Sequence, residues 1–232
     1  MAHPNRAERS TSWRGNLVWL LGIGITAFAV PFTFSSILHW PRSVFLVPYL
    51  VIIGSETLLY LRWIGFDRHD LVRRWPVGFG LALAASAFVV ASLRRYPPSP
   101  APEGIALVSS LAWLGFAYGA VDALLLNVLP VLAARSLAFA AIRRPWLRAS
   151  LRGGAALAIS AALSLVYHLG YSEFRGSSVA SPVFGNVLIT ATYVVSGNPL
   201  APIITHVAMH IGAIEYGIET VPQLPPHEPP SR

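Results

Sequence analysis

Long apolar stretches alternate with short polar stretches along almost the whole chain. A helix rises about 1.5 Å per residue, so about 20 apolar residues cross a hydrocarbon core of about 30 Å. The pattern predicts seven membrane-spanning helices, at 17–38, 44–62, 77–93, 104–134, 154–171, 179–195 and 200–217. The fourth stretch is longer than one crossing needs and contains Pro130, so it is predicted to be kinked or to form two shorter elements.

These stretches predict an all-α fold, a polytopic transmembrane helix bundle with a single membrane domain. Residues 1–16 would form a polar cytoplasmic tail, residues 17–218 the transmembrane helical domain, and residues 219–232 a Pro-rich disordered tail. Composition supports the membrane class, because 54% of the 232 residues are hydrophobic and only 12% are charged, against about 25% charged in soluble domains.

Arginine is concentrated in alternate loops. Arginines precede the first span and follow the second and the fourth: Arg6, Arg9, Arg14, Arg62, Arg68, Arg73, Arg74, Arg135, Arg143, Arg144, Arg148 and Arg152. The opposite loops hold only Arg42, Arg94, Arg95 and Arg175. The positive-inside rule therefore predicts a multi-pass protein of the cell (plasma) membrane with a cytoplasmic amino terminus, and seven spans would leave the carboxyl terminus outside.

The formal net charge of +7 does not indicate nucleic-acid binding. The arginines lie between apolar spans and form no basic patch, so the expected partner is the anionic leaflet of the lipid bilayer. The chain has no cysteine, which excludes disulfides, thiol catalysis and iron–sulfur ligation by its own residues.

Within the predicted spans, the side chains that are hardest to explain as lipid-facing are Glu56, Asp122, His168, His206 and His210. A charged side chain at mid-membrane costs about 2.5–3.5 kcal/mol on insertion scales, so such groups usually face the bundle interior or a wet cavity. Glu56 lies near a span end and is interpreted as a structural residue whose carboxyl reaches the interface. The other four fall in the inner to middle part of the membrane, which makes them candidate site residues.

His206 and His210 are four residues apart in THVAMH, which places both imidazoles on one face of a helix. Asn198 and Pro199 supply a plausible start for that helix. With Asp122 and His168 they make a ligand set suited to zinc or another divalent metal. Two other interpretations stay open at this point: an interhelical packing network, and a haem or metal-binding membrane protein with histidine ligands.

The order of these residues resembles the CPBP family of CAAX-protease and bacteriocin-processing (Abi) intramembrane proteases. The family's EExxxR motif corresponds to residues 121–126 within GAVDALLLNVLP, its aromatic-rich stretch ending in His to SLVYHLGY with His168, and its HxxxN helix to NPLAPIITHVAMH with His206 and His210. The resemblance covers residues 104–217. It implies an all-α intramembrane endopeptidase of metallo- or glutamic type that acts on a peptide or protein substrate.

What the resemblance implies for the site is residue-specific. His168, His206 and His210 would hold a metal or water or stabilise the oxyanion, and Asp122 would serve as general base or ligand. The chain departs from the family pattern at four positions: Val121 stands for the first Glu, Asp122 for the second Glu, Leu126 for the Arg and His210 for the last Asn. Because valine cannot take a proton, the expected activity is divergent or impaired, and the alternative is a catalytically silent relative that binds or regulates a membrane partner.

Overall fold

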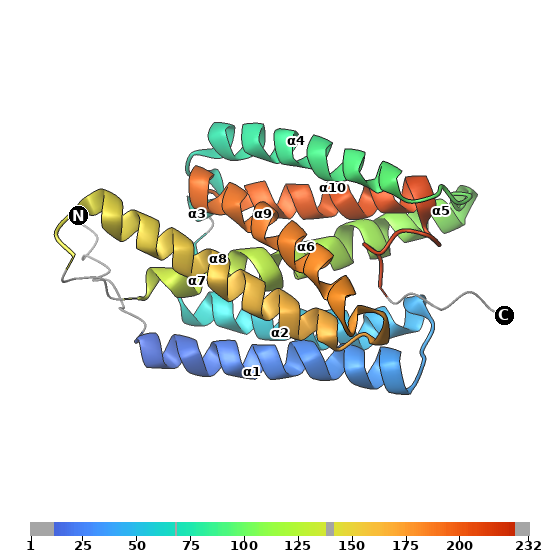
Figure 1. Cartoon of the computed structure of the whole chain (residues 1–232), viewed down its shortest axis with the longest axis horizontal. Coiled ribbons are helices and arrows are strands. Elements are labelled where there is room, and N and C mark those ends of the chain that lie inside the picture. Colours follow the sequence, from blue (N-terminus) through green and yellow to red (C-terminus); the bar gives the residue numbers. More distant parts are fainter. Residues whose placement is uncertain (1–11, 68, 138–141, 226–232) are drawn as a thin grey trace, which may run out of the picture.

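The computed structural model describes residues 12–67, 69–137 and 142–225, and within these ranges it contains helices and no strand. The long helices are packed roughly along one axis, with α9 crossing obliquely (Figure 1). The α-helices are α1 (Trp13–Pro31), α2 (Arg42–Trp63), α3 (His69–Val72), α4 (Trp75–Ser92), α5 (Gly104–Ser110), α6 (Gly119–Ala123), α7 (Leu129–Arg135), α8 (Pro145–Leu169), α9 (Ala180–Ser196) and α10 (Leu200–Gly217). The prediction of an all-α helix bundle is confirmed.

Six helical segments of the described chain are long and apolar enough to cross a membrane: Trp13–Ile37, Arg42–Trp63, Trp75–Arg95, Gly104–Arg135, Pro145–Leu169 and Ser177–Ser196. Large apolar side chains on these segments are exposed on the outside of the bundle, among them Ile25, Phe116 and Val195. Such a coat is favourable only against lipid, so the chain is a multi-pass membrane protein.

The seventh predicted span is helical but differs from the other six. Helix α10 has the predicted bounds and 18 residues, yet it is not among the segments apolar enough to count as a span. It carries the buried His206 and His210 and, near its end, the exposed Glu215, and it packs against α4, α6 and α9 inside the bundle (Figure 1). A helix covered by neighbouring helices can carry polar residues that a lipid-facing helix cannot.

The fourth predicted span is one continuous helix, Gly104–Arg135, and it is the most buried of the six. It consists of α5, α6 and α7 joined by two π-helical segments, Leu111–Tyr118 and Leu124–Val128. Pro130 lacks the amide N–H that would bond the carbonyl of Leu126 in an α-helix. The hydroxyl of Ser160 on α8 donates to that carbonyl at 2.7 Å instead, so the helix continues through the proline.

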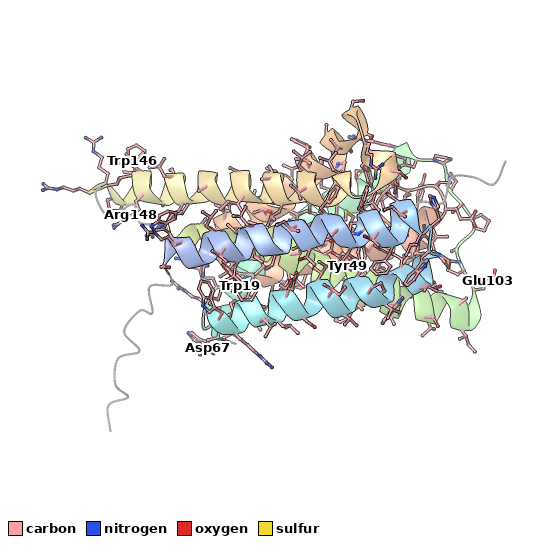
Figure 2. The ribbon with its side chains drawn as sticks, turned by 90° about the horizontal axis from the view of Figure 1, so that it is seen from below. Trp19, Tyr49, Asp67, Glu103, Trp146 and Arg148 are labelled. Atoms are coloured by element: carbon pink, nitrogen blue, oxygen red, sulfur yellow. The ribbon has the colours of Figure 1, made fainter. Side chains whose placement is uncertain are left out.

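The two ends of the bundle differ in charge. Asp67, Trp146 and Arg148 lie at one end, and Glu103 lies at the other (Figure 2). The arginine-rich loops after the second and fourth spans therefore share an end, as the positive-inside rule requires. Which end faces the cytoplasm stays a prediction.

The carboxyl-terminal segment differs from the expectation of a disordered tail that starts at residue 219. Residues 218–225 pack against the end of the bundle, where Val221 and Leu224 are fully buried. The guanidinium of Arg42 donates to the carbonyl of Ile218 at 3.1 Å and to that of Pro225 at 2.8 Å. Apolar burial and these two bonds hold the segment in place. The rest of the predicted tail, 226–232, and most of the amino-terminal tail, 1–11, lie outside the described residues.

Candidate functional site

Three of the predicted site residues converge inside the bundle. Asp122 on α6 and His206 and His210 on α10 each offer a ligand atom, and these atoms lie within 4.8 Å of one another. His206 Nε2 is 3.1 Å from Asp122 Oδ2, and His210 Nε2 is 4.0 Å from the same oxygen. All three side chains are buried. The i, i+4 spacing on α10 stacks the two imidazoles, with centroids 5.0 Å apart and planes 26° apart.

Asn127 fixes the tautomer of His206. The amide nitrogen of Asn127 donates to the carbonyl of Asn186 at 3.1 Å and to the hydroxyl of Thr190 at 3.0 Å. Its Oδ1 therefore faces His206 Nδ1, 2.9 Å away, and can only accept. The Nδ1 of His206 must carry a proton, which leaves Nε2 of the neutral ring with a lone pair.

That lone pair is aimed at a carboxylate, which is also an acceptor. Asp122 Oδ1 already accepts a hydrogen bond from the hydroxyl of Tyr49 on α2 at 2.7 Å. Two acceptors, His206 Nε2 and Asp122 Oδ2, cannot share a 3.1 Å contact without a proton or a cation between them. The pair is thus built to hold either one proton or one cation.

His210 is the least satisfied member of the group. Neither of its ring nitrogens makes a well-formed hydrogen bond to a described residue, although the ring is 1% exposed; its polar neighbours are the backbone of Gln223 and Asp122 Oδ2, 4.0 Å from Nε2. Its ring packs edge-on against Tyr118, with centroids 4.8 Å apart. A buried imidazole without a good hydrogen bond is costly, and an ion or a water between the ring and these groups would satisfy it.

His168 is not part of the three-residue group. Its Nδ1 contacts the carbonyl of Ser164 at 2.7 Å, one turn back on α8. The residue lines the same cavity as Asp122, His206 and His210. The structure therefore brings together three of the four predicted ligands and places the fourth on the wall of their cavity.

Residue 121, where the CPBP motif has its first Glu, faces another helix. A Cβ added to Gly54 of α2 would lie 3.7 Å from the Val121 side chain, whereas Asp122 faces α10. No rotation of α6 is needed for Asp122 to reach the histidines. Glu56, interpreted as structural, accepts a hydrogen bond from Thr26 on α1 at 3.0 Å and does not join the group.

A cavity of about 500 Å³ extends from Asp122 and the histidines toward the end of the bundle. Three tyrosine hydroxyls on its wall form a chain, with 2.6 Å between Tyr118 and Tyr167 and 2.7 Å between Tyr167 and Tyr171. The three hydroxyls carry three protons, and the two hydrogen bonds among them use two. The third proton can be donated to another acceptor in the cavity, beside the acid–histidine group.

The sequence indicated neither Tyr49 nor Asn127 as site residues. A tyrosine in an apolar span is ordinary, and Tyr49 lies in the amino-terminal half, which has no recognisable motif. Asp122 and Asn127 are five positions apart, which in an α-helix separates them by about 140°. The π-helical segment Leu124–Val128 widens the turn, so both side chains reach His206.

Tyr49→Phe tests whether Asp122 is ionised, because it removes only the hydroxyl that donates to Asp122 and keeps the ring. We expect a loss of about 1.5–3 kcal/mol in the free energy of unfolding, because the lost bond ends on a buried carboxylate. Tyr60→Phe is the matched control on the same helix, since its hydroxyl donates to the neutral amide oxygen of Asn16 at the same 2.7 Å. Thermal unfolding in detergent should show the larger loss for Tyr49→Phe. Equal losses would contradict an ionised Asp122.

Fold and site together define a multi-pass helical membrane protein with a buried carboxylate–histidine group at the inner end of a cavity. The chain matches no protein-family profile, no curated protein and no solved structure with which it was compared. The resemblance to the CPBP family thus depends on the motif residues alone.

Proposed function

We propose that the chain is a CPBP-like intramembrane hydrolase that cleaves a peptide bond with water activated at Asp122. The observation that carries the proposal is the convergence of Asp122, His206 and His210 within 4.8 Å at the inner end of a cavity that can admit a substrate. Peptide hydrolysis needs an activated water and a hydrogen-bonding environment for the developing oxyanion. Both requirements have candidate groups in this cavity.

The residues also fit a divalent metal such as zinc. Neutral imidazole and carboxylate are ordinary zinc ligands, and a metal-bound histidine usually donates its other ring N–H to a neighbouring oxygen. The Nδ1–H of His206 makes that second contact with Asn127, and His210, which makes no well-formed hydrogen bond to a described residue, has a ring nitrogen available to the metal. A metal bound by Asp122, His206 and His210 would polarise a water and leave a fourth position open to it.

The chain's own groups have separate roles in this proposal. Asp122, oriented by the hydroxyl of Tyr49, accepts a proton from the attacking water and passes it to the leaving amine nitrogen when the C–N bond breaks. The spare proton of the Tyr118–Tyr167–Tyr171 chain is available to a developing oxyanion. His168, on the cavity wall, can hold the leaving group or the water.

The alternative is a catalytically silent relative that binds or regulates a membrane partner. One observation favours it: both oxygens of Asp122 already have a protein partner, the hydroxyl of Tyr49 for Oδ1 and His206 Nε2 for Oδ2. If a proton joins Asp122 and His206, the cluster is a packing network, and Asp122 is a weaker base toward water.

Zinc content separates a metal site from a packing network. We expect the purified protein, dialysed against zinc and then against buffer, to retain about one zinc per chain by elemental analysis, and His206→Ala to lose it because one ligand is gone. His39→Ala is the control, since His39 is exposed and lies outside the group. Zinc near zero in the unmodified protein, or equal zinc in both variants, would contradict the metal site.

A further inference from the structure

We propose that the cavity opens sideways to the bilayer between α4 and α9, and that its occupant is a membrane amphiphile with an extended apolar chain and a phosphate-bearing head. The proposal goes beyond the proposed peptide cleavage, because it concerns only the opening of the cavity and the amphiphile that enters it. The opening itself is a property of the helix arrangement.

The arrangement of α4 and α9 produces the opening. The two helices are tied together at one end, where the amide nitrogen of Asn198, just after α9, donates to the carbonyls of Leu71 and Arg73, just before α4. Toward the other end α9 moves away from α4 and crosses toward α8 (Figure 1). The cavity is lined by the diverging halves of both helices.

The rim of this opening is apolar and exposed. Phe88 on α4 and Phe184 and Leu188 on α9 line the cavity, and they are 57%, 64% and 37% exposed. Side chains at this position along membrane-spanning segments face acyl chains, not water. An apolar chain that lies between the two helices would cover the exposed phenylalanine faces.

The outer end of the cavity is polar. Arg95, at the last position of the Trp75–Arg95 segment, lines the cavity together with Ser178 and Ser181, and all three are exposed. Arg95 makes no ion pair with any described residue. Because this position is the end of a membrane span, a guanidinium there lies at the depth of lipid phosphates, which it binds well. Glu173 lines the same end.

The carboxyl-terminal segment forms another wall of the cavity and limits the routes by which a molecule can enter it. Pro222, Gln223 and Leu224 line the cavity from the end of the bundle, and Arg42 holds their segment through two backbone carbonyls. The rim between α4 and α9 is therefore a route for an apolar chain that does not displace packed protein. Such a chain, with its head at Arg95, can reach the acid–histidine group through one cavity.

Single-cysteine labelling tests this directly, because the natural chain has no cysteine. The NBD fluorophore is attached to Met209→Cys, in the cavity, and separately to Gly185→Cys, where an added Cβ meets no atom within 4 Å. In proteoliposomes, phosphatidylcholine with a nitroxide on the acyl chain reports lipid contact, and iodide reports water contact. Phe116→Cys on the lipid-facing surface and Asp67→Cys in a loop set the upper and lower limits of lipid quenching.

We expect nitroxide-lipid quenching at both cavity positions close to that of the lipid-facing control. Leu188→Trp should reduce it by narrowing the rim, whereas Phe79→Trp, exposed on α4 away from the cavity, should not. Arg95→Gln should weaken it about two- to fivefold, as expected for loss of one exposed ion pair, and Arg94→Gln should have no effect.

Lipid quenching at the level of the loop control, or strong iodide quenching in its place, would overturn the proposal and indicate a substrate that arrives from water. Zinc content measured on the same samples is independent of this result. If lipid quenching is absent but zinc is retained, the opening is refuted and the proposed function stands. If lipid quenching is present but zinc is absent, only the metal site is refuted.

Discussion

Asp122→Asn should remove both metal binding and peptide cleavage while the protein stays folded. The substitution keeps the shape of the side chain but takes away the carboxylate that faces His206 and His210. Loss of a general base typically lowers a rate by about two to four orders of magnitude. Cleavage of a pooled library of fluorogenic apolar peptides in proteoliposomes, together with zinc analysis, measures both effects.

His168→Ala is the informative partner variant. Because His168 lies outside the convergent group, this variant should retain zinc and lose cleavage, whereas Asp122→Asn should lose both. Turnover retained in both variants would remove the assigned catalytic roles. If both variants only lowered stability or partner binding, the catalytically silent alternative would be supported.

The second large effect is expected at Asn127, a fully buried residue that does not line the cavity. Asn127→Leu removes the acceptor for His206 Nδ1–H, so the ring can rotate and protonate at Nε2, the atom that would hold the metal. Loss of such an outer contact typically costs about 10–100-fold in metal affinity. Zinc titration of the purified variant against a competing chelator measures the change.

Thr190→Val is the control for that experiment. Thr190 accepts a hydrogen bond from the same Asn127 amide but does not touch His206, so its substitution disturbs the network and leaves the acceptor oxygen in place. We expect reduced stability with nearly unchanged zinc affinity. An equal loss of affinity in the two variants would show that Asn127 acts through general packing and not through the histidine tautomer.

Much of the fold was predictable because a bilayer imposes a simple rule on sequence. Every backbone polar group in hydrocarbon must be bonded internally, so an apolar stretch of sufficient length is a helix. The predicted edges of 44–62 and 200–217 lie close to or on those of α2 and α10. The alternating arginine-rich loops indicated which loops lie at the same end of the bundle, and Figure 2 shows Asp67 and Arg148 at one end.

Side-chain chemistry within the spans could be predicted only in part. The cost of polar groups in lipid singled out Asp122, His206 and His210, and the i, i+4 spacing placed both imidazoles on one face. The same argument selected His168 without showing that its Nδ1 contacts its own helix. The carboxyl-terminal segment was expected to be disordered from its prolines, but Val221 and Leu224 find an apolar surface to bury.

The sequence by itself determined the class of protein, a helical membrane bundle, and the few costly side chains that its interior had to accommodate. Only the tertiary structure decided how those side chains are used. The contact from Tyr49 on α2, the tautomer set by Asn127 and the cavity lined by α4 and α9 join residues that are distant in sequence or that only a π-helical turn brings together. No local pattern encodes them, because they depend on helix rotation and crossing, which packing between helices decides.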